Sequence, residues 1–237
     1  MSNRILVVLM STLLAACAFQ SPPRTDPLAD LVGKAKIVDS PARTVTEGKT
    51  KTLALIVSTS AETQIKHREE TDTKYLDGYI KSYQSGSYNT IKSMQQSVGP
   101  RKLIDTVVSE LRQRFKTVTV VADLAEFRER NQDVAAVVDV GMEYSTSSGI
   151  SSVSGAYTTD VSIIFFDRQI RKIGIASGKA TESTERSNAD ENIKAFFLVF
   201  ADTPPEEQYK PFMNAEQKSR TSAFKLLNTS LDHLVPK

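Results

Sequence analysis

Five segments of the chain have the hydrophobic pattern of β-strands. Residues 53–57 form a continuous apolar run between polar residues, which predicts a buried strand. Residues 157–166 alternate between apolar and polar positions before they become apolar on both faces. The other three strands are predicted over 118–121, 134–140 and 172–183. A Ser/Gly-rich stretch over 145–155 is expected to link the third strand to the fourth.

Helical periodicity is clearest between the first two strands and at the carboxyl end. Leu103, Val107 and Leu111 lie on one stripe of a helix. Because Pro100 suits a first helical turn, this stripe predicts a helix over 100–115 with one buried face. Two further helices are predicted over 124–130 and 213–234.

The order of these elements predicts an α/β fold, with a mixed β-sheet of about five strands and helices packed against it. The order is β–(α)–α–β–α–β–β–β–α. Helices separate the first three strands, which favours parallel pairing among them. A turn near 167–171 predicts that the last two strands form an antiparallel hairpin.

The amino terminus has the features of an export signal. Arg4 precedes a largely apolar run over 5–14. The run is too short to cross roughly 30 Å of hydrocarbon, which takes about 20 residues, so we expect a signal peptide. The small residues Ala15 and Ala16 mark the cleavage zone before Cys17. From these residues alone, Cys17 could instead follow a plain signal peptide or be a buried thiol.

The segment Leu14-Ala15-Ala16-Cys17 resembles the lipobox of bacterial lipoproteins. The resemblance implies that residues 1–16 are a signal peptide and that Cys17 is acylated, with palmitate among its chains, and so anchors the mature protein to a membrane. Ala18, in place of the aspartate that retains such proteins at the inner membrane, implies the periplasmic face of the outer membrane. The proline-containing residues 17–50 are predicted to be a flexible tether. Residues 51–237 are predicted to be a single α/β periplasmic domain.

Composition narrows the classes of function. The chain has 237 residues, 40% of them hydrophobic, which is enough for a buried core and excludes wholesale disorder. Thirty basic residues against 28 acidic ones create no global field for nucleic acid, so no nucleic-acid partner is expected. One cysteine excludes an internal disulfide, and two histidines leave little room for a metal site. We therefore expect no cofactor and no metal.

The residues that could carry chemistry form no recognisable catalytic pattern. His67 lies in a run of charges of both signs, and His233 lies near the end of the last helix, where a cation suits the helix dipole. The stretch 174–179 lacks the spacing of a phosphate-binding loop. Nothing marks Glu182 and Glu185 as an acid/base pair. The prediction is a protein that is not an enzyme and has no catalytic residues.

Two segments are candidates for a partner-binding surface. Within the less regular, mostly polar segment 59–98, Tyr75, Tyr79 and Tyr83 recur every four residues, which predicts one face of a helix, and tyrosine is enriched at interfaces. The connection over 195–201 is apolar throughout, and an exposed apolar loop would indicate a partner or a membrane contact. Its aromatic residues are Phe196, Phe197 and Phe200. Each segment could instead pack against the domain itself.

Over 52–235 the apolar first strand, the helix 101–115, the later strands and the terminal helix resemble the periplasmic domain of curli-secretion channel lipoproteins and the amino-terminal domain of TolB. The resemblance implies a domain that works in the envelope by binding other proteins. Curli channels insert two long hairpins per subunit into a membrane barrel. Here the segment at the first of these positions, 141–158, is too polar and too short for such a hairpin, and the apolar residues 195–201 lack the alternation of apolar and polar side chains that a barrel strand needs. We therefore expect a non-enzymatic accessory factor of a secretion or envelope complex. The alternative is a subunit of a homo-oligomeric, curli-type secretion channel.

Overall fold

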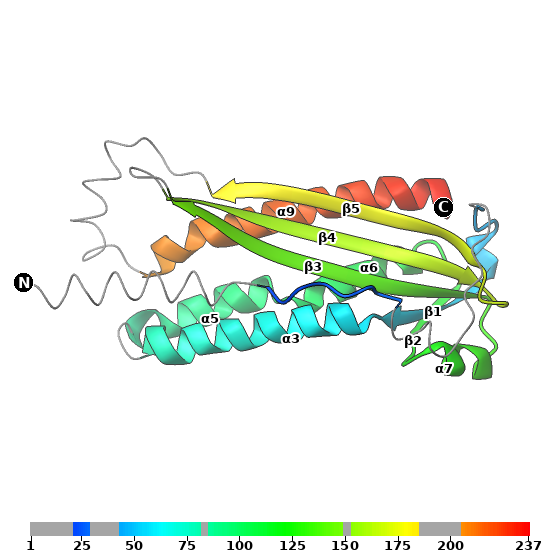
Figure 1. The fold of residues 1–237 in the computed structure, drawn as a ribbon, viewed down its shortest axis with the longest axis horizontal. Helices are drawn as coiled ribbons and strands as arrows, with labels where there is room; N and C mark the ends of the chain where they lie inside the picture. The colour runs from blue at the N-terminus through cyan, green and yellow to red at the C-terminus, as the bar shows by residue number, and fades with distance from the viewer. Residues whose placement is uncertain (1–20, 29–42, 82–84, 149–152, 185–204) are drawn as a thin grey trace, which may run out of the picture.

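The structure is a computed structural model that describes residues 21–28, 43–81, 85–148, 153–184 and 205–237. Its centre is a five-stranded mixed sheet with the strand order β2-β1-β3-β4-β5 (Figure 1). The strands are β1 (Thr52–Val57), β2 (Thr117–Val120), β3 (Val134–Ser148), β4 (Val153–Asp167) and β5 (Lys172–Thr184). β1 pairs in parallel with β2 and β3, whereas β3, β4 and β5 pair antiparallel. The predicted α/β class, the mixed five-stranded sheet and the directions of the strands are confirmed.

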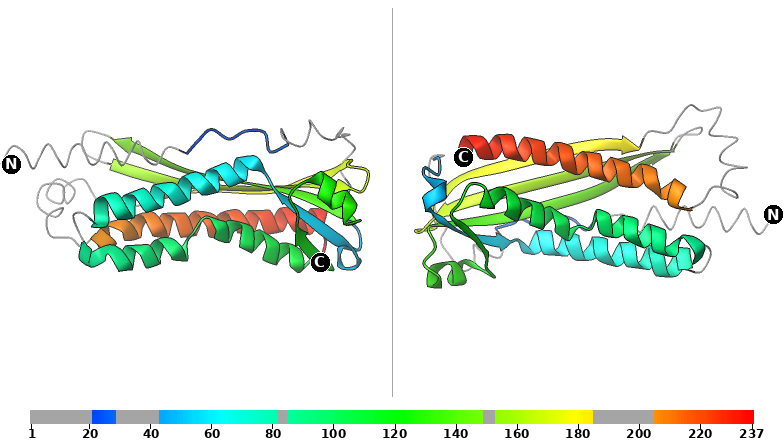
Figure 2. Two further views of the ribbon diagram at one scale, coloured as in Figure 1. Left: turned by 90° about the horizontal axis from the view of Figure 1, so that it is seen from below. Right: turned by 180° about the vertical axis from the view of Figure 1, so that it is seen from behind.

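The helices lie mainly on one face of this sheet. Four of them, α3, α5, α6 and α9, cover one face, while α7 and residues 21–28 lie on the other (Figure 2). Among the described residues the α-helices are α3 (Thr59–Lys74), α5 (Tyr88–Ser97), α6 (Arg101–Arg112), α7 (Leu124–Glu129) and α9 (Pro205–Leu234). The shorter helical segments are η1 (Gly48–Thr50), the π-helix η2 (Tyr75–Ile80) and η3 (Ser85–Ser87). We call the face under the four helices the inner face and the opposite one the outer face.

Three elements differ from their predictions. The strands β3 and β4 pair as far as Ser148 and Val153, so most of the predicted Ser/Gly-rich link is strand. At the β4 end of this stretch the Gly155 N–H also donates to Thr184 Oγ1 of β5 at 3.0 Å, which adds a cross-strand bond. Helix α9 begins at Pro205, eight residues before its predicted start. In the segment 59–98, where a helix was predicted only at the tyrosine stripe, the 16-residue helix α3 comes before that stripe.

Helix α3 carries few apolar residues, which is why its periodicity is weak in the sequence. Its buried side combines Ala61 and Ile65 with the polar Gln64 and Thr71. Ser58 caps its first turn, because its Oγ accepts a hydrogen bond from the Ala61 N–H at 2.9 Å. Polar residues with partners therefore take the place of an apolar stripe.

The core is divided by the sheet. The larger part lies on the inner face, where side chains such as Val138, Ile163 and Phe165 share one apolar cluster with Val107 of α6 and with residues of α9. The smaller part lies on the outer face, where Phe127 of α7 packs near Phe166. Successive side chains of β1, β3 and β4 point to opposite faces of the sheet, so each strand contributes alternate residues to the two parts of the core.

The molecule is elongated along the β3–β4–β5 meander. At about 3.3 Å per residue, the 15-residue strand β3 is about 50 Å long. At one end of the molecule lie the end of β3 and the start of β4. The start of α9, the end of α3, η2 and the start of α5 lie at the same end (Figure 1). We call it the hairpin end. The opposite end, with β1, β2, α7 and the carboxyl terminus, is the base end.

Parts of the predicted tether contact the folded domain. Val45 is buried in the inner core, and its N–H donates to the Leu234 carbonyl at 2.8 Å. Residues 21–28 lie along the outer face of β3. Residues 29–42 and Cys17 lie outside the described residues, so the flexible character of that stretch stays a prediction. Within the described parts of the chain, no helix has both the length and the apolar character needed to cross a membrane.

Candidate functional site

An aspartate pair on the outer face holds the amino-terminal segment. Asp139 on β3 and Asp160 on β4 lie on the same face of neighbouring strands. The Arg24 guanidinium joins them, donating from Nη1 to Asp160 Oδ2 at 2.7 Å and from Nη2 to Asp139 Oδ2. Asp139 is only 1% exposed and also accepts a hydrogen bond from Ser58 Oγ at 2.6 Å. One cation therefore neutralises a buried carboxylate and links two strands.

Gly141 provides the room for this contact. A Cβ added at Gly141 would lie 2.9 Å from Arg24 Nη1 and 3.0 Å from Arg24 Cδ. The guanidinium thus rests directly on the backbone of β3. Burial works against the charge of Arg24, but the hydrogen bonds and charges of Asp139 and Asp160 outweigh it and raise the pKa of Arg24.

Contacts on both sides of Arg24 fix the direction of the segment. Ser21 Oγ donates to the Met142 carbonyl, and Gln64 Nε2 donates to the Pro22 carbonyl at 2.6 Å. At the other end of the segment, Leu28 packs against the apolar part of the outer face. Residues 21–28, which we call the docked segment, therefore run from the middle of β3 toward the base end.

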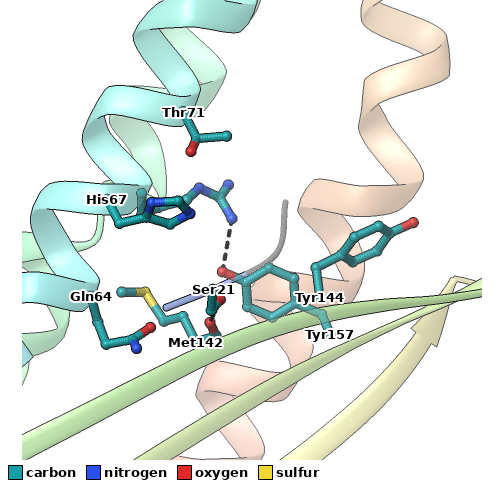
Figure 3. A pocket seen from close by; sticks show the side chains of 8 residues that line it. Ser21, Gln64, His67, Thr71, Met142, Tyr144 and Tyr157 are labelled. Carbon is teal, nitrogen blue, oxygen red and sulfur yellow. Dashed lines mark hydrogen bonds between the residues drawn. The ribbon is translucent and has the colours of Figure 1, made fainter. Parts of the chain in front are cut away.

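A small cleft opens where the docked segment meets α3 (Figure 3). It contains about 300 Å³ of empty space, the open solvent at its mouth included. Its lining consists of Ser21, Gln64, His67, Arg68, Thr71, Met142, Tyr144 and Tyr157. Arg68 donates from Nη1 to Tyr157 Oη at 2.9 Å.

Beneath the cleft, charged side chains join α3 to α9. Arg68 bonds Glu216 at 2.9 Å and Asp72 at 3.0 Å. Arg220, one turn along α9, also bonds Glu216. Glu216 is 2% exposed, so these groups form a buried ion cluster of Arg68, Asp72, Glu216 and Arg220. Its two positive and two negative charges balance, as burial of charge requires.

Burial governs the protonation of this cluster. It raises the pKa of Asp72, although the neighbouring Arg68 charge works in the opposite direction. It also raises the pKa of Tyr157 far above its ordinary value, so this phenol stays neutral. A neutral Tyr157 and a paired Arg68 orient one another but supply no free base or nucleophile to the cleft.

The two histidines lie far apart in the fold and share no site. His67 lines the cleft, and its Nε2 is buried without a hydrogen-bond partner. His233 lies in the last turn of α9, at the base end. Among the described residues, no three histidine, cysteine, aspartate or glutamate side chains are placed to hold a metal ion.

The predicted binding surfaces are described only in part. Tyr75 is half-buried against the small cluster formed by Leu76 and Ile91. The backbone of Tyr79 lies in η2, and Tyr83 lies outside the described residues. The aromatic residues of the apolar connection, Phe196, Phe197 and Phe200, also lie outside them. Partner binding by either surface stays a prediction.

Sequence reasoning missed the charged residues that shape this site. Asp139 could have been noticed, because it is a carboxylate inside an otherwise apolar strand, 134–140. Gly141, two residues later, has no strand preference and indicates a close approach of another group. Arg24 gave no such signal, because its partners lie 115 and 136 residues away.

Comparisons with known proteins assign no family. No protein-family model and no curated protein matches the chain. A neuraminyllactose-binding hemagglutinin homologue from Helicobacter pylori has 14% identity and a TM-score of 0.29, over 77% of this chain and 95% of that one. A Xanthomonas campestris protein described as DUF330 has 7% identity and a TM-score of 0.28, over 84% of this chain and 99% of that one. Lipoprotein GNA1162 from Neisseria meningitidis has 15% identity and a TM-score of 0.25, over 65% of this chain and 99% of that one. At these values the similarity to bacterial envelope proteins is weak.

Proposed function

We propose that this chain is a bacterial envelope lipoprotein, held through Cys17 at the periplasmic face of the outer membrane. Its folded domain would act as a binding or assembly factor of a secretion or envelope complex and not as an enzyme. The observation that carries this proposal is the position of Ser21, the first residue of the docked segment. Only residues 18–20 separate it from Cys17.

The short separation supports a mature chain that begins at Cys17. The contacts of Ser21, Pro22 and Arg24 are specific and partly buried, so the folded domain is built to include the chain almost from that point. Cleavage before Cys17 would leave these contacts intact. Cleavage several residues later would remove them and leave Asp139 without its cation.

The bonds of Arg68 in the cleft support a structural role for this side chain over a catalytic one. A catalytic group needs a pKa close to the working pH and a free valence toward the substrate. Arg68 instead bonds Asp72, Glu216 and Tyr157, and these bonds serve the packing of α3 against α9. The cleft is also smaller than a typical small-molecule site, because its roughly 300 Å³ includes the open solvent at its mouth.

Acylation and membrane sorting test the anchor. The wild type should incorporate labelled palmitate and sediment with outer membranes of a Gram-negative host. Cys17→Ser should lose the label, while Ala18→Asp, a matched variant that keeps Cys17, should keep the label and move to the inner membrane. An unlabelled wild type would refute the proposal.

The native mass in mild detergent tests the role of the domain. A monomer or small complex with one co-purifying envelope protein is expected for an accessory factor. A homogeneous particle of many copies of this chain would contradict that role and favour the secretion-channel alternative. The co-purifying protein would also identify the pathway.

A further inference from the structure

We propose that the hairpin end of the domain rests on the bilayer that anchors Cys17, in contact with phospholipid headgroups. This inference rests on the proposed function, because it requires the acyl chains on Cys17. It adds an orientation and a second contact with the lipid surface, made by the folded domain itself.

The length of chain between anchor and fold imposes the first constraint. Four peptide steps join Cys17 to Ser21, and they span at most about 14 Å when fully extended. Ser21 is fixed to Met142, and β3 continues six residues beyond it to Ser148. Those six residues extend about 20 Å toward the hairpin end. The hairpin end therefore reaches past the farthest position available to the anchor.

The direction of the docked segment strengthens this constraint. The chain runs from Met142 toward the base end between Ser21 and Leu28, so its extrapolation before Ser21 points toward the hairpin end (Figure 1). An anchor on that side brings the bilayer to the hairpin end first. The base end, about 50 Å away along β3, is then held in the aqueous phase.

The distribution of tyrosine is a second, independent observation. Two tyrosines with partly exposed side chains, Tyr75 of η2 and Tyr88 of α5, lie at the hairpin end. Tyr144 is half-buried and packs edge-on against Phe212 of α9, with ring centroids 5.6 Å apart. Tyrosine favours the headgroup layer, because its ring is apolar and its hydroxyl stays hydrated.

Exposed lysines occur at the same end. Lys92 lies over the Tyr88 ring at 5.8 Å, so an ammonium and a phenol are presented together. Lys74, Lys81 and Lys210 are exposed on neighbouring elements, as is the acidic Asp77. Lysine side chains at a membrane surface place their stems on apolar groups and their charges among phosphates.

A single tryptophan can report which part of the molecule touches lipid, since the chain has none. Ser183→Trp places it on the exposed outer face of β5 near the hairpin end, and Ile175→Trp places it on the same face toward the base end. Ile175 is 47% exposed, so the second site tolerates the ring. Each acylated full-length variant is reconstituted into phosphatidylethanolamine and phosphatidylglycerol vesicles whose acyl chains are brominated near the headgroup.

We expect the brominated lipid to quench the tryptophan emission of Ser183→Trp and to leave the emission of Ile175→Trp unchanged. Inserting a Gly/Ser linker of about ten residues after Phe19, which adds a mean span of about 17 Å, should restore the Ser183→Trp emission. Arg24→Ala should also restore the Ser183→Trp emission, because it loosens the docked segment. Arg168→Ala, which removes an exposed ion pair at the base end, should leave the emission unchanged.

Other outcomes overturn the orientation in distinguishable ways. Quenching at both sites would mean that the domain lies flat on its outer face. Quenching at neither site, in protein that still floats with the vesicles, would reject the bilayer contact and leave the anchor intact. Wild-type protein that neither carries palmitate nor floats with vesicles would reject the proposed function, and the orientation with it. Circular dichroism of each variant verifies that the fold is retained.

Discussion

Neutralising Glu216 should destabilise the domain strongly, because this carboxylate is the shared acceptor of the buried ion cluster. Its side chain is 3% exposed and bonds both Arg68 and Arg220. Glu216→Gln keeps the shape of the side chain but leaves two buried guanidinium groups with one counter-charge, Asp72. Breaking a buried ion pair from one side costs about 3–5 kcal/mol. We expect the lower figure, about 3 kcal/mol, because Asp72 stays bonded to Arg68.

The assay is reversible unfolding of the mature chain carrying Cys17→Ser, followed by circular dichroism in urea and on heating. For a domain of this size each kcal/mol corresponds to about 2–4 °C, so Tm should fall by about 6–12 °C. The matched control is Glu70→Gln, which removes an ion pair with Lys66 at 4.0 Å on exposed side chains. It should cost less than about 0.5 kcal/mol.

A double variant tests the reasoning itself. Adding Arg220→Met to Glu216→Gln restores one positive charge, Arg68, to one negative charge, Asp72. The double variant should therefore be more stable than the sum of the two single losses predicts, by more than about 1 kcal/mol. Strict additivity, or a loss below about 1 kcal/mol for Glu216→Gln alone, would refute the view that charge balance holds α3 against α9.

Three further variants test other contacts through the same unfolding assay. Gly178→Ala should cost at least about 3 kcal/mol, because its Cβ would lie 2.0 Å from a backbone carbonyl oxygen of α9, whereas Gly78→Ala meets nothing within 4 Å and should be neutral or stabilising. Asp133→Asn should cost about 1–2 kcal/mol at neutral pH. The backbone N–H of Thr52 lowers the pKa of Asp133, so the stability from this ionised group should vanish as the pH falls below 3.8, and a gap between variant and wild type that stays constant with pH would contradict this. Ser58→Ala removes a helix cap and a bond to a buried carboxylate and should cost about 1–2 kcal/mol; an unchanged urea midpoint would show that neither bond matters.

The sheet was predictable because its signal is local. The apolar runs around Leu55 and Val137 need a two-sided core wherever they are placed, and the helices between the strands leave few alternatives to parallel pairing. The polar continuation of β3 and β4 was not predictable in the same way. Serine and threonine between Tyr144 and Tyr157 match a loop as well as a strand, and only cross-strand pairing decides between them.

The site was largely beyond sequence reasoning because it depends on distant charges. Arg68 and Asp72 are neighbours on one helix face and could have been paired from their spacing. Their burial, however, depends on Glu216, which arrives on a helix about 150 residues later. A run of charges on α3 is typical of a solvated surface until the complementary charges on α9 are known.

The docking of Arg24 also sets an order of events during folding. The β3–β4–β5 meander joins segments that are close in sequence, so it can form early. The two carboxylates that bind Arg24 are those of Asp139 and Asp160, and they come together only after β3 and β4 have paired. The docked segment is thus synthesised before these strands, yet it can reach its final place only after they have paired.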